Sequence, residues 1–146
     1  MNLTWRIDQS SIDWDELSQL YLIAPLGIKP AEDLKVIFTN SKFKCFLYNE
    51  SYIIGIGRAL ADGSDCSYIC DIAIHPEYQG FGFGKQIVQN LIKQSEGHKK
   101  IILYANLGKE GFYSKLGFKK MNTAMAIFQN ESEMIHNGIL SEYSNS

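Results

Sequence analysis

The sequence has few cysteines and no long hydrophobic run. Its three cysteines (Cys45, Cys66 and Cys70) are an odd number, at spacings that fit neither a zinc ribbon nor a disulfide framework. No apolar run approaches the ~20 residues that span a bilayer, and the opening residues lack the apolar core and cleavage site of a secretory signal. These absences predict a cytoplasmic protein with no metal site and no membrane partner.

The sequence also lacks an excess of positive charge. Fourteen Lys and Arg face 16 Asp and Glu, for a formal net charge of −2, so a phosphate backbone would not be neutralised and nucleic acid is a poor candidate partner. Apolar residues, in contrast, make up 45% of the 146 residues, which is enough to bury a core. Disorder as the main state is thereby excluded.

No repeat and no Pro- or Ser-rich linker divides the chain. We therefore predict a single domain over residues 1–130. Residues 121–146 carry three acids and no basic residue, and residues 131–146 are expected to form an acidic and polar C-terminal tail. The last residues, 141–146, have no pattern and are expected to be frayed.

Hydrophobic periodicity alternates between strand and helix along the chain. Asp13 and Glu16 have the spacing of a capping box at the start of a helix, and Pro30 suits the first turn of a second helix. Further helices are predicted after Gly84 and over 109–116, and strands over 3–7, 44–48, 52–60, 66–75, 100–104 and 125–128. This order predicts a mixed α/β sheet.

Residues 72–92 contain three glycines at alternate positions, Gly80, Gly82 and Gly84, between a strand and an amphipathic helix. Glycine lets the backbone turn sharply and lets a ligand approach main-chain nitrogens. The unpaired amides and the dipole of the following helix favour an anion, and Lys85 adds a positive charge. Two interpretations stay open: a cradle for phosphate or pyrophosphate, or a tight turn that uses glycine for structural reasons alone.

Two common phosphate motifs are excluded here. The spacing is Gly-x-Gly-x-Gly rather than the GxGxxG of dinucleotide folds, and no acid follows about 20 residues later at a strand end. Gln86 follows Lys85, where a P-loop requires Ser or Thr.

Residues 79–84, Gln-Gly-Phe-Gly-Phe-Gly, resemble the Q/R-x-x-G-x-G/A signature of the GNAT acetyltransferase superfamily. Residues 75–78, His-Pro-Glu-Tyr, are similar to the segment that precedes this signature, and GFYSKLGF at 111–118 is similar to the F-Y-E-K-L-G-F segment of the family. The resemblance is clear over 66–128 and loose over 1–65. It implies a GNAT-like, mostly antiparallel sheet of six to seven strands, flanked by about four helices, with a splayed central strand pair.

The resemblance also implies acetyl-CoA as co-substrate. Its pantetheine arm would pair with the main chain of Ile72, Ala73 and Ile74, and Asn106 and Phe112 would contribute further cofactor contacts. Its pyrophosphate would lie on the backbone amides of Gln79, Gly80, Phe81, Gly82, Phe83, Gly84 and Lys85.

Tyr113 matches the family tyrosine that protonates the leaving thiolate. A phenol with an ordinary pKa near ~10 can give up its proton to a developing anion beside it. The alternative is that Tyr113 packs in the core beside Phe112 and Phe118.

Asp71 is an acid within an otherwise apolar strand, which costs free energy unless the carboxylate is paired or used. It is a candidate general base, or an attractor of a cationic amine, and the alternative is a structural partner for Arg58. Strict alternation would put Asp71 on one face with Ser67, Ile69, Ala73 and His75.

Other side chains near these positions have simpler interpretations. His75 is expected to form a hydrogen bond in the turn, and Cys66 and Cys70 to be small core residues, so a covalent cysteine mechanism is not supported. Gly55 and Gly57 leave room on one strand face for either a substrate or a crossing helix.

The resemblance predicts an N-acetyltransferase, in which a primary amine attacks acetyl-CoA directly within a ternary complex. The expected partner is a small-molecule amine, and a homodimer is allowed. Two alternatives remain: a CoA-binding regulator without catalysis, and an acetyltransferase of protein lysines or N-termini.

Overall fold

The computed structural model describes residues 1–142, and the chain forms two compact units, Met1–Leu103 and Tyr104–Ser146. The end of the segment predicted to fray, residues 143–146, lies outside the described part of the chain. The predicted domain over 1–130 stays a prediction.

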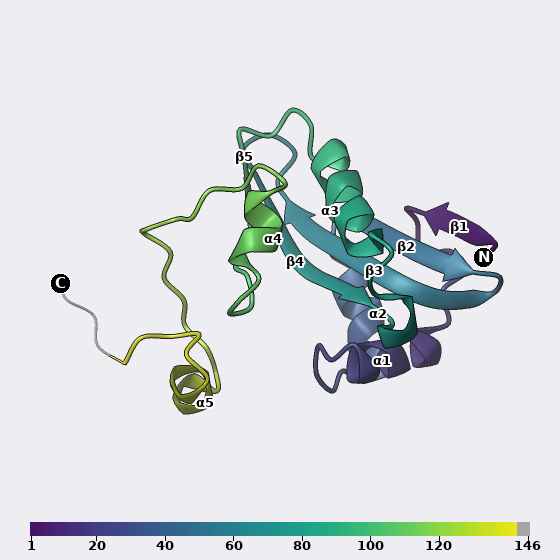
Figure 1. The fold of residues 1–146 in the computed structure, drawn as a ribbon, viewed down its shortest axis with the longest axis horizontal. Helices are drawn as coiled ribbons and strands as arrows, with labels where there is room; N and C mark the ends of the chain where they lie inside the picture. The colour runs from purple at the N-terminus through teal and green to yellow at the C-terminus, as the bar shows by residue number, and fades with distance from the viewer. Residues whose placement is uncertain (143–146) are drawn as a thin grey trace. The chain divides into compact units, whose positions relative to one another are not determined.

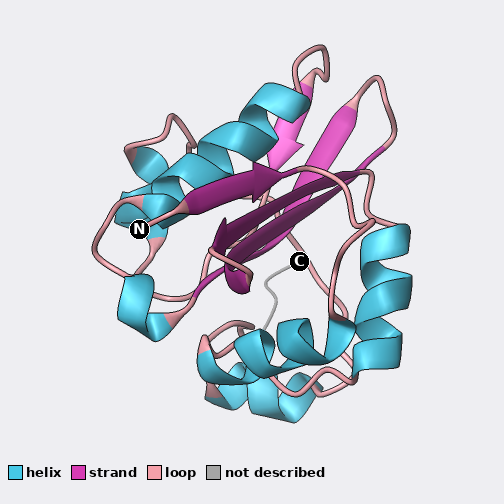
Figure 2. Ribbon diagram, turned by 90° about the vertical axis from the view of Figure 1, so that its right-hand side faces the viewer, coloured by secondary structure: helices cyan, strands magenta, loops and turns pink. Residues whose placement is uncertain are grey.

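The first unit is built on one twisted sheet (Figures 1 and 2). Its strands, in the order β1-β2-β3-β4-β5, are β1 (Leu3–Arg6), β2 (Phe43–Asn49), β3 (Tyr52–Ala61), β4 (Cys66–Ile74) and β5 (Lys100–Ile102). The first four strands are antiparallel neighbours, and β5 runs parallel to β4. The mixed, mostly antiparallel sheet is therefore confirmed.

The prediction of six to seven strands is wrong, because the described residues form five. Residues 125–128 form no strand, and Met125 and Ile127 there are 87% and 103% exposed. A strand needs a neighbour for its backbone hydrogen bonds, and an apolar composition does not supply one. β5 also ends at Ile102, two residues before the predicted end of that strand.

Helices cover both faces of the sheet in the first unit (Figure 1). Helices α1 (Trp14–Ile23) and α2 (Ala31–Thr39) lie on one face, and α3 (Phe83–Gln94) lies on the other. Pro30 occupies the N-cap of α2, one residue before the predicted position.

The second unit contains two short helices, α4 (Glu110–Ser114) and α5 (Glu131–His136). The described residues therefore form five α-helices rather than about four. Helix α5 lies within the predicted tail. Glu131 and Glu133 occupy its first turn, where the helix dipole favours acids.

The predicted capping box at α1 is only half formed. The Asp13 carboxylate accepts hydrogen bonds from the amides of Asp15 and Glu16, at 3.0 and 3.1 Å. The Glu16 carboxylate does not return this bond, and instead accepts one from the amide of Ile53 in β3. Glu16 thus joins α1 to the sheet.

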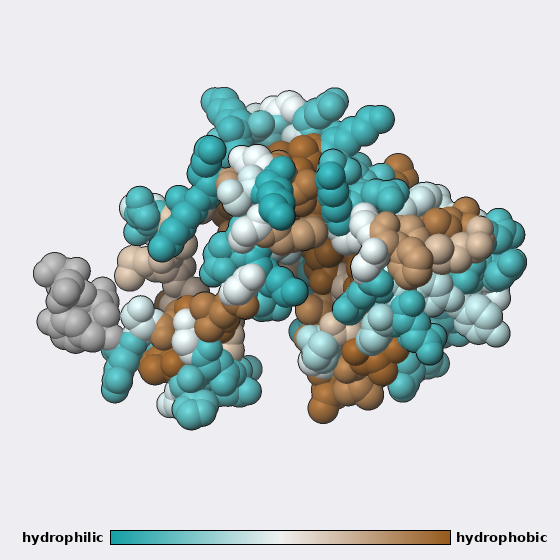
Figure 3. Space-filling model, viewed as in Figure 1, coloured by the Kyte–Doolittle hydropathy of each residue, from teal (hydrophilic) through white to brown (hydrophobic). Residues whose placement is uncertain are grey.

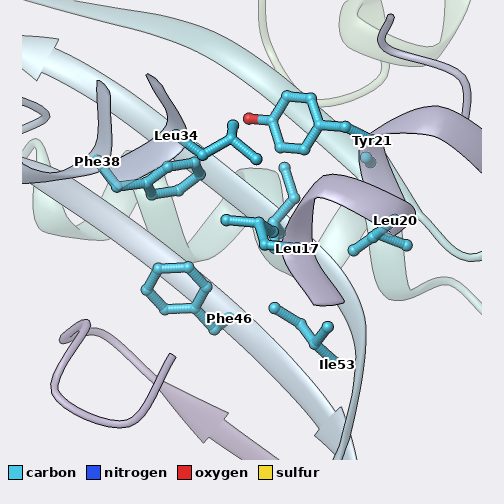
Figure 4. Close-up of a cluster of buried hydrophobic side chains, with 9 residues drawn as sticks. Leu17, Leu20, Tyr21, Leu34, Phe38, Phe46 and Ile53 are labelled. Atoms are coloured by element: carbon cyan, nitrogen blue, oxygen red, sulfur yellow. The ribbon is translucent and has the colours of Figure 1, made fainter. Parts of the chain in front are cut away.

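The main core lies between the sheet and helices α1 and α2 (Figure 4). Phe38 of α2 stands 5.4 Å from Phe46 of β2, ring centre to ring centre. Burying each such side chain contributes about 1.5–3 kcal/mol. The labelled residues of this core are Leu17, Leu20, Tyr21, Leu34, Phe38, Phe46 and Ile53.

The opposite face of β3 is where the two strand glycines lie. A Cβ on Gly57 would stand 2.5 Å from Ile87 Cγ2, and one on Gly55 would stand 3.0 Å from Ile87 Cδ1. Of the two interpretations of these glycines, the crossing helix is correct, because α3 packs directly on them.

Candidate active site

The strand β4 contains a β-bulge at Cys70. Arg58 of β3 pairs with Asp71, and the next residue, Ala59, pairs with Ile69, so Cys70 is an extra residue on β4. A bulge breaks the alternation of side chains along its strand.

The bulge makes the predicted face assignment wrong. Before it, Ser67 faces α3, because its Oγ lies 2.8 Å from Ser95 Oγ at the end of that helix. Beyond it, Ile72 contacts the α3 side of Gly57, while Ala73 packs into the α1 core and Asp71 binds Tyr21. Ser67 and Asp71 therefore lie on opposite faces.

One edge of β4 is open beyond the bulge. β5 pairs with β4 only over residues 66–68, whereas β4 continues to Ile74. Within residues 1–103, no strand pairs with Ile72, Ala73 or Ile74 on that side. The expected splayed strand pair stays a prediction, and a free strand edge can pair with an extended ligand.

The glycine turn follows immediately and leads into α3. Gly80 and Gly82 have φ of 88° and 82°, a left-handed conformation that glycine adopts without steric cost. The first intrahelical bond runs from Gln86 N to Gly82 O, so the amides of Phe83, Gly84 and Lys85 point out of the helix start. A Cβ on Gly80 or Gly82 would meet nothing within 4 Å. The turn is therefore open to an anion, which the helix dipole favours.

The side chains of the turn differ in their availability to a ligand. Gln79 Nε2 donates to Ile74 O at 3.1 Å, which holds the turn against the end of β4. Phe83 is buried, with exposed Phe81 stacked on it at 5.7 Å, so Phe83 can offer a ligand only its backbone. Lys85 is exposed.

The segment before the turn is held by local contacts. His75 Nδ1 accepts a hydrogen bond from Glu77 N at 3.1 Å, which confirms the predicted role of His75 in the turn. Its ring stands edge-on to Tyr78, at 5.6 Å between ring centres.

A pocket of about 470 Å³ lies beside this segment, between α1 and the start of β3. Leu20 and Ile23 line its apolar side, and Glu16 and Glu77 add two carboxylates. Figure 3 shows apolar side chains gathered over α1. An apolar pocket with acidic groups suits an organic cation.

Asp71 lies at the bulge in a network of hydrogen bonds. Arg58 Nε lies 2.6 Å from Asp71 Oδ2, and Tyr21 Oη donates to the same oxygen at 2.8 Å. The structural pairing with Arg58 therefore exists. Sequence reasoning missed the bond from Tyr21, because no local pattern links residues 50 positions apart.

Electrostatics fix the protonation of the neighbouring groups. Burial, together with the charge of Asp71, raises the pKa of Tyr21, so the phenol stays protonated and donates. Burial also raises the pKa of the Cys70 thiol, and raises that of Cys45 to about 12. Both thiols stay protonated at neutral pH and are poor nucleophiles.

The second unit carries the remaining candidates. Tyr113 lies in α4, with its ring edge-on to Phe112 at 5.0 Å and to Phe118 at 5.9 Å. Burial raises the pKa of Tyr113, so its hydroxyl stays protonated at neutral pH and can donate a proton. Phe112 and Asn106 are exposed, and the Asn106 carbonyl accepts from Lys109 N at 3.0 Å.

Residues 1–142 contain neither a cluster of metal ligands nor a membrane-spanning helix. In that range, no group of three or more His, Cys, Asp or Glu side chains is placed to hold a metal ion. None of the helices described there is both long enough and apolar enough to cross a bilayer.

Comparison with known proteins matches this architecture. The model of the acetyltransferase (GNAT) family matches residues 10–118. An uncharacterized N-acetyltransferase, ycf52, of Pyropia yezoensis is 33% identical over 116 residues, which are 75% of this chain and 67% of that protein. The chain spans 53–67% of the length of four such ycf52 and ycf52-like relatives.

Solved structures share the fold. A GNAT family acetyltransferase of Streptococcus pneumoniae, SP0256, has a TM-score of 0.75 at 19% identity, over 88% of this chain and 98% of that one. Naa50 of Arabidopsis thaliana, in complex with the bisubstrate analogue CoA-Ac-MVNAL, has a TM-score of 0.68 at 15% identity, over 84% and 86% of the two chains. At such identities the likeness shows the fold alone.

Proposed function

We propose that the chain, which belongs to the acetyltransferase (GNAT) family and is therefore an acyltransferase, transfers the acetyl group of acetyl-CoA to a primary amine. The observation that carries this proposal is the open turn at Gly80 and Gly82, which ends at the free amides of α3. A turn of this kind favours a pyrophosphate.

The residues present fit CoA along one continuous path. The amides of residues 80–85 would hold the pyrophosphate, whereas Gln79 N already donates to Pro76 O at 3.4 Å. The free edge of β4 at Ile72, Ala73 and Ile74 would pair with the pantetheine amides. Asn106 and Phe112 are proposed as further contacts. When bound, acetyl-CoA supplies an activated thioester, so no metal is required of the protein.

Two side chains are proposed to move protons. The amine attacks the acetyl carbon as the carbon–sulfur bond breaks, and Tyr113 gives its hydroxyl proton to the leaving thiolate. Burial raises the pKa of Tyr113, so the proton is present at neutral pH and is held more tightly than by an exposed phenol. Asp71 is proposed to receive the ammonium of the acceptor and to take its proton, directly or through water.

The alternatives have weaker support. A CoA-binding regulator would not need a proton donor in the GFYSKLGF segment. The presence of Tyr113 there therefore favours an enzyme. The pocket beside α1, with Glu16 and Glu77 in its lining, supports an acceptor that is an organic cation. Three free thiols suit a reducing compartment such as the cytoplasm, and a homodimer stays a prediction.

Gly82→Asp tests the proposal through CoA binding. The new carboxylate would lie at the anion site and repel the pyrophosphate, so we expect calorimetry to detect no CoA binding. Gly97→Asp is a matched control, because Gly97 also has a positive φ, of 94°, and a Cβ there also meets nothing within 4 Å. The two variants bear similar backbone strain, and only Gly97→Asp should keep the affinity. Unchanged CoA affinity in a folded Gly82→Asp variant would contradict the proposed cofactor site.

A further inference from the structure

The two donors that reach Asp71 converge on one atom. Arg58 Nε and Tyr21 Oη both bind Oδ2, at 2.6 and 2.8 Å, although a carboxylate has two oxygens that could share them. Arg58 comes from β3 and Tyr21 from α1, so two separate elements fix the same oxygen.

The other oxygen, Oδ1, is left available. Within residues 1–142 this oxygen has no hydrogen-bond partner, and it is not buried. The Asp71 side chain is 16% exposed, so solvent reaches the carboxylate at this oxygen. Asp71 also directly precedes Ile72, where the free edge of β4 begins.

Both donors are held in place by their own surroundings. Tyr21 is fully buried, with its ring edge-on to Phe38 at 6.4 Å. Arg58 also donates from Nη1 to Ser41 Oγ at 3.3 Å, and that hydroxyl donates to Ile37 O at 2.8 Å. Neither donor can change its direction without leaving packed contacts, so the carboxylate cannot rotate freely.

We propose that Tyr21 and Arg58 are positioning residues that bind Oδ2 of Asp71 and so reserve Oδ1 for the ammonium group of the acceptor. This inference rests on the proposed function and narrows its substrate class. The acceptor is an amine that is positively charged in water, such as an alkylamine, rather than a neutral arylamine. Oδ1 belongs to a carboxylate and has no donor of its own, so it suits an ammonium group that brings N–H donors.

The proposed proton transfer takes place at Oδ1 of Asp71. The ammonium gives a proton to Oδ1, directly or through a bound water that passes its own proton on, so that the N–H bond breaks and an O–H bond forms on Oδ1. The nitrogen keeps the electron pair with which it attacks the acetyl carbon. An acceptor that is neutral in water does not need this step.

Binding of n-butylammonium and of neutral aniline to the full chain, with and without CoA, tests the proposal by NMR titration. We expect the Kd of n-butylammonium to rise about tenfold or more in Tyr21→Phe, the effect of losing one hydrogen bond to a charged group, and to rise further, while staying measurable, in Asp71→Asn. Aniline binding should not change in either variant.

Tyr48→Phe is the matched control. The Tyr48 hydroxyl is buried without a partner among the described residues, so its loss should leave the Kd of n-butylammonium unchanged. Adding Tyr21→Phe to Asp71→Asn should weaken binding no further, because Tyr21 acts only through Asp71.

Equal losses for n-butylammonium and aniline, or an additive effect in the double variant, would overturn the proposal. So would the absence of n-butylammonium binding to the unmodified chain. Acetyl transfer is measured separately, by thiol release with a panel of amines. If no amine is acetylated although n-butylammonium binds through Asp71, the proposed function fails and the positioning roles stand.

Discussion

One hydroxyl separates the two interpretations of Tyr113. If it protonates the leaving thiolate, Tyr113→Phe should lower turnover by about 10²-fold and leave acetyl-CoA binding nearly intact, since general acids contribute roughly that factor. If the ring serves only to pack against Phe112 and Phe118, turnover should not change, because phenylalanine keeps those ring contacts. Steady-state kinetics with a saturating amine measures the difference.

Tyr104→Phe is the control for that experiment. Tyr104 belongs to the same unit and contacts Phe128 edge-on at 6.1 Å, so the exchange removes a hydroxyl from a comparable aromatic pair. It should leave turnover unaltered. A comparable drop in both variants would show that the loss of turnover is not specific to the Tyr113 hydroxyl, which contradicts its role as proton donor.

Asp62 makes stability depend on pH. Its carboxylate accepts from the amides of Ser64 and Asp65, at 2.8 and 2.7 Å, and these bonds lower the pKa of Asp62 to about 2. A lowered folded-state pKa stabilises the fold above the ordinary value of about 3.9, and this contribution is lost as the pH falls towards 2. Asp62→Asn should therefore reduce the urea midpoint at pH 7, with the difference from the unmodified chain shrinking as the pH falls from about 5 and disappearing only near pH 1. A difference that stays constant with pH would contradict this role of Asp62.

Individual side chains were predictable where their partners are local. The turn bond of His75 spans two residues and was expected from the sequence. Glu16 was expected to return to Asp13, but it binds Ile53, 37 residues away. Such a partner depends on how α1 packs on the sheet, and local spacing carries no information on that.

At the contact between β3 and α3, glycine is required by space rather than by backbone conformation. Gly57→Ala would place its methyl group 2.5 Å from Ile87 Cγ2 and 2.9 Å from Leu91 Cδ1, both fully buried side chains of α3. Overpacking of this kind destabilises by about 1–3 kcal/mol. Urea unfolding should show a loss of that size.

Gly111→Ala is the matched exchange in another helix. A Cβ on Gly111 meets nothing within 4 Å, and alanine is the better helix former, so this variant should be neutral or more stable by about 0.5–1 kcal/mol. Equal effects of the two exchanges would show that the contact with α3 is not the cause.

Two predictions about strands failed for one physical reason. Alternation along 66–75 cannot reveal the extra residue Cys70, because a bulge is defined by the pairing of β4 with β3. The apolar residues 125–128 were predicted to form a strand. A strand needs a second strand to pair with, and the sequence of the segment does not show whether one lies beside it. The strand, turn and helix around Gly82 were predicted well, because the signals for all three are adjacent in the sequence.

For the whole chain, the family match over residues 10–118 extends across the boundary between the two compact units. The glycine turn could be located from the sequence because it is one continuous segment. The network at Asp71 could not, because it joins residues of α1, β3 and β4. Recognition of an acceptor depends on such distant combinations, so the sequence indicates the donor more clearly than the acceptor.

Binding of CoA should raise the melting temperature of the whole protein. A ligand that binds only the folded state at about 100 times its Kd stabilises it by about 2.7 kcal/mol, which corresponds to several degrees for a chain of this size. Because the turn at Gly80 and Gly82 offers backbone amides to phosphate, adenosine, which has no phosphate, should give no such shift. Differential scanning fluorimetry would measure both, and Gly82→Asp should lose the CoA shift while Gly97→Asp keeps it. Equal shifts with adenosine and CoA would mean that recognition lies outside the glycine turn.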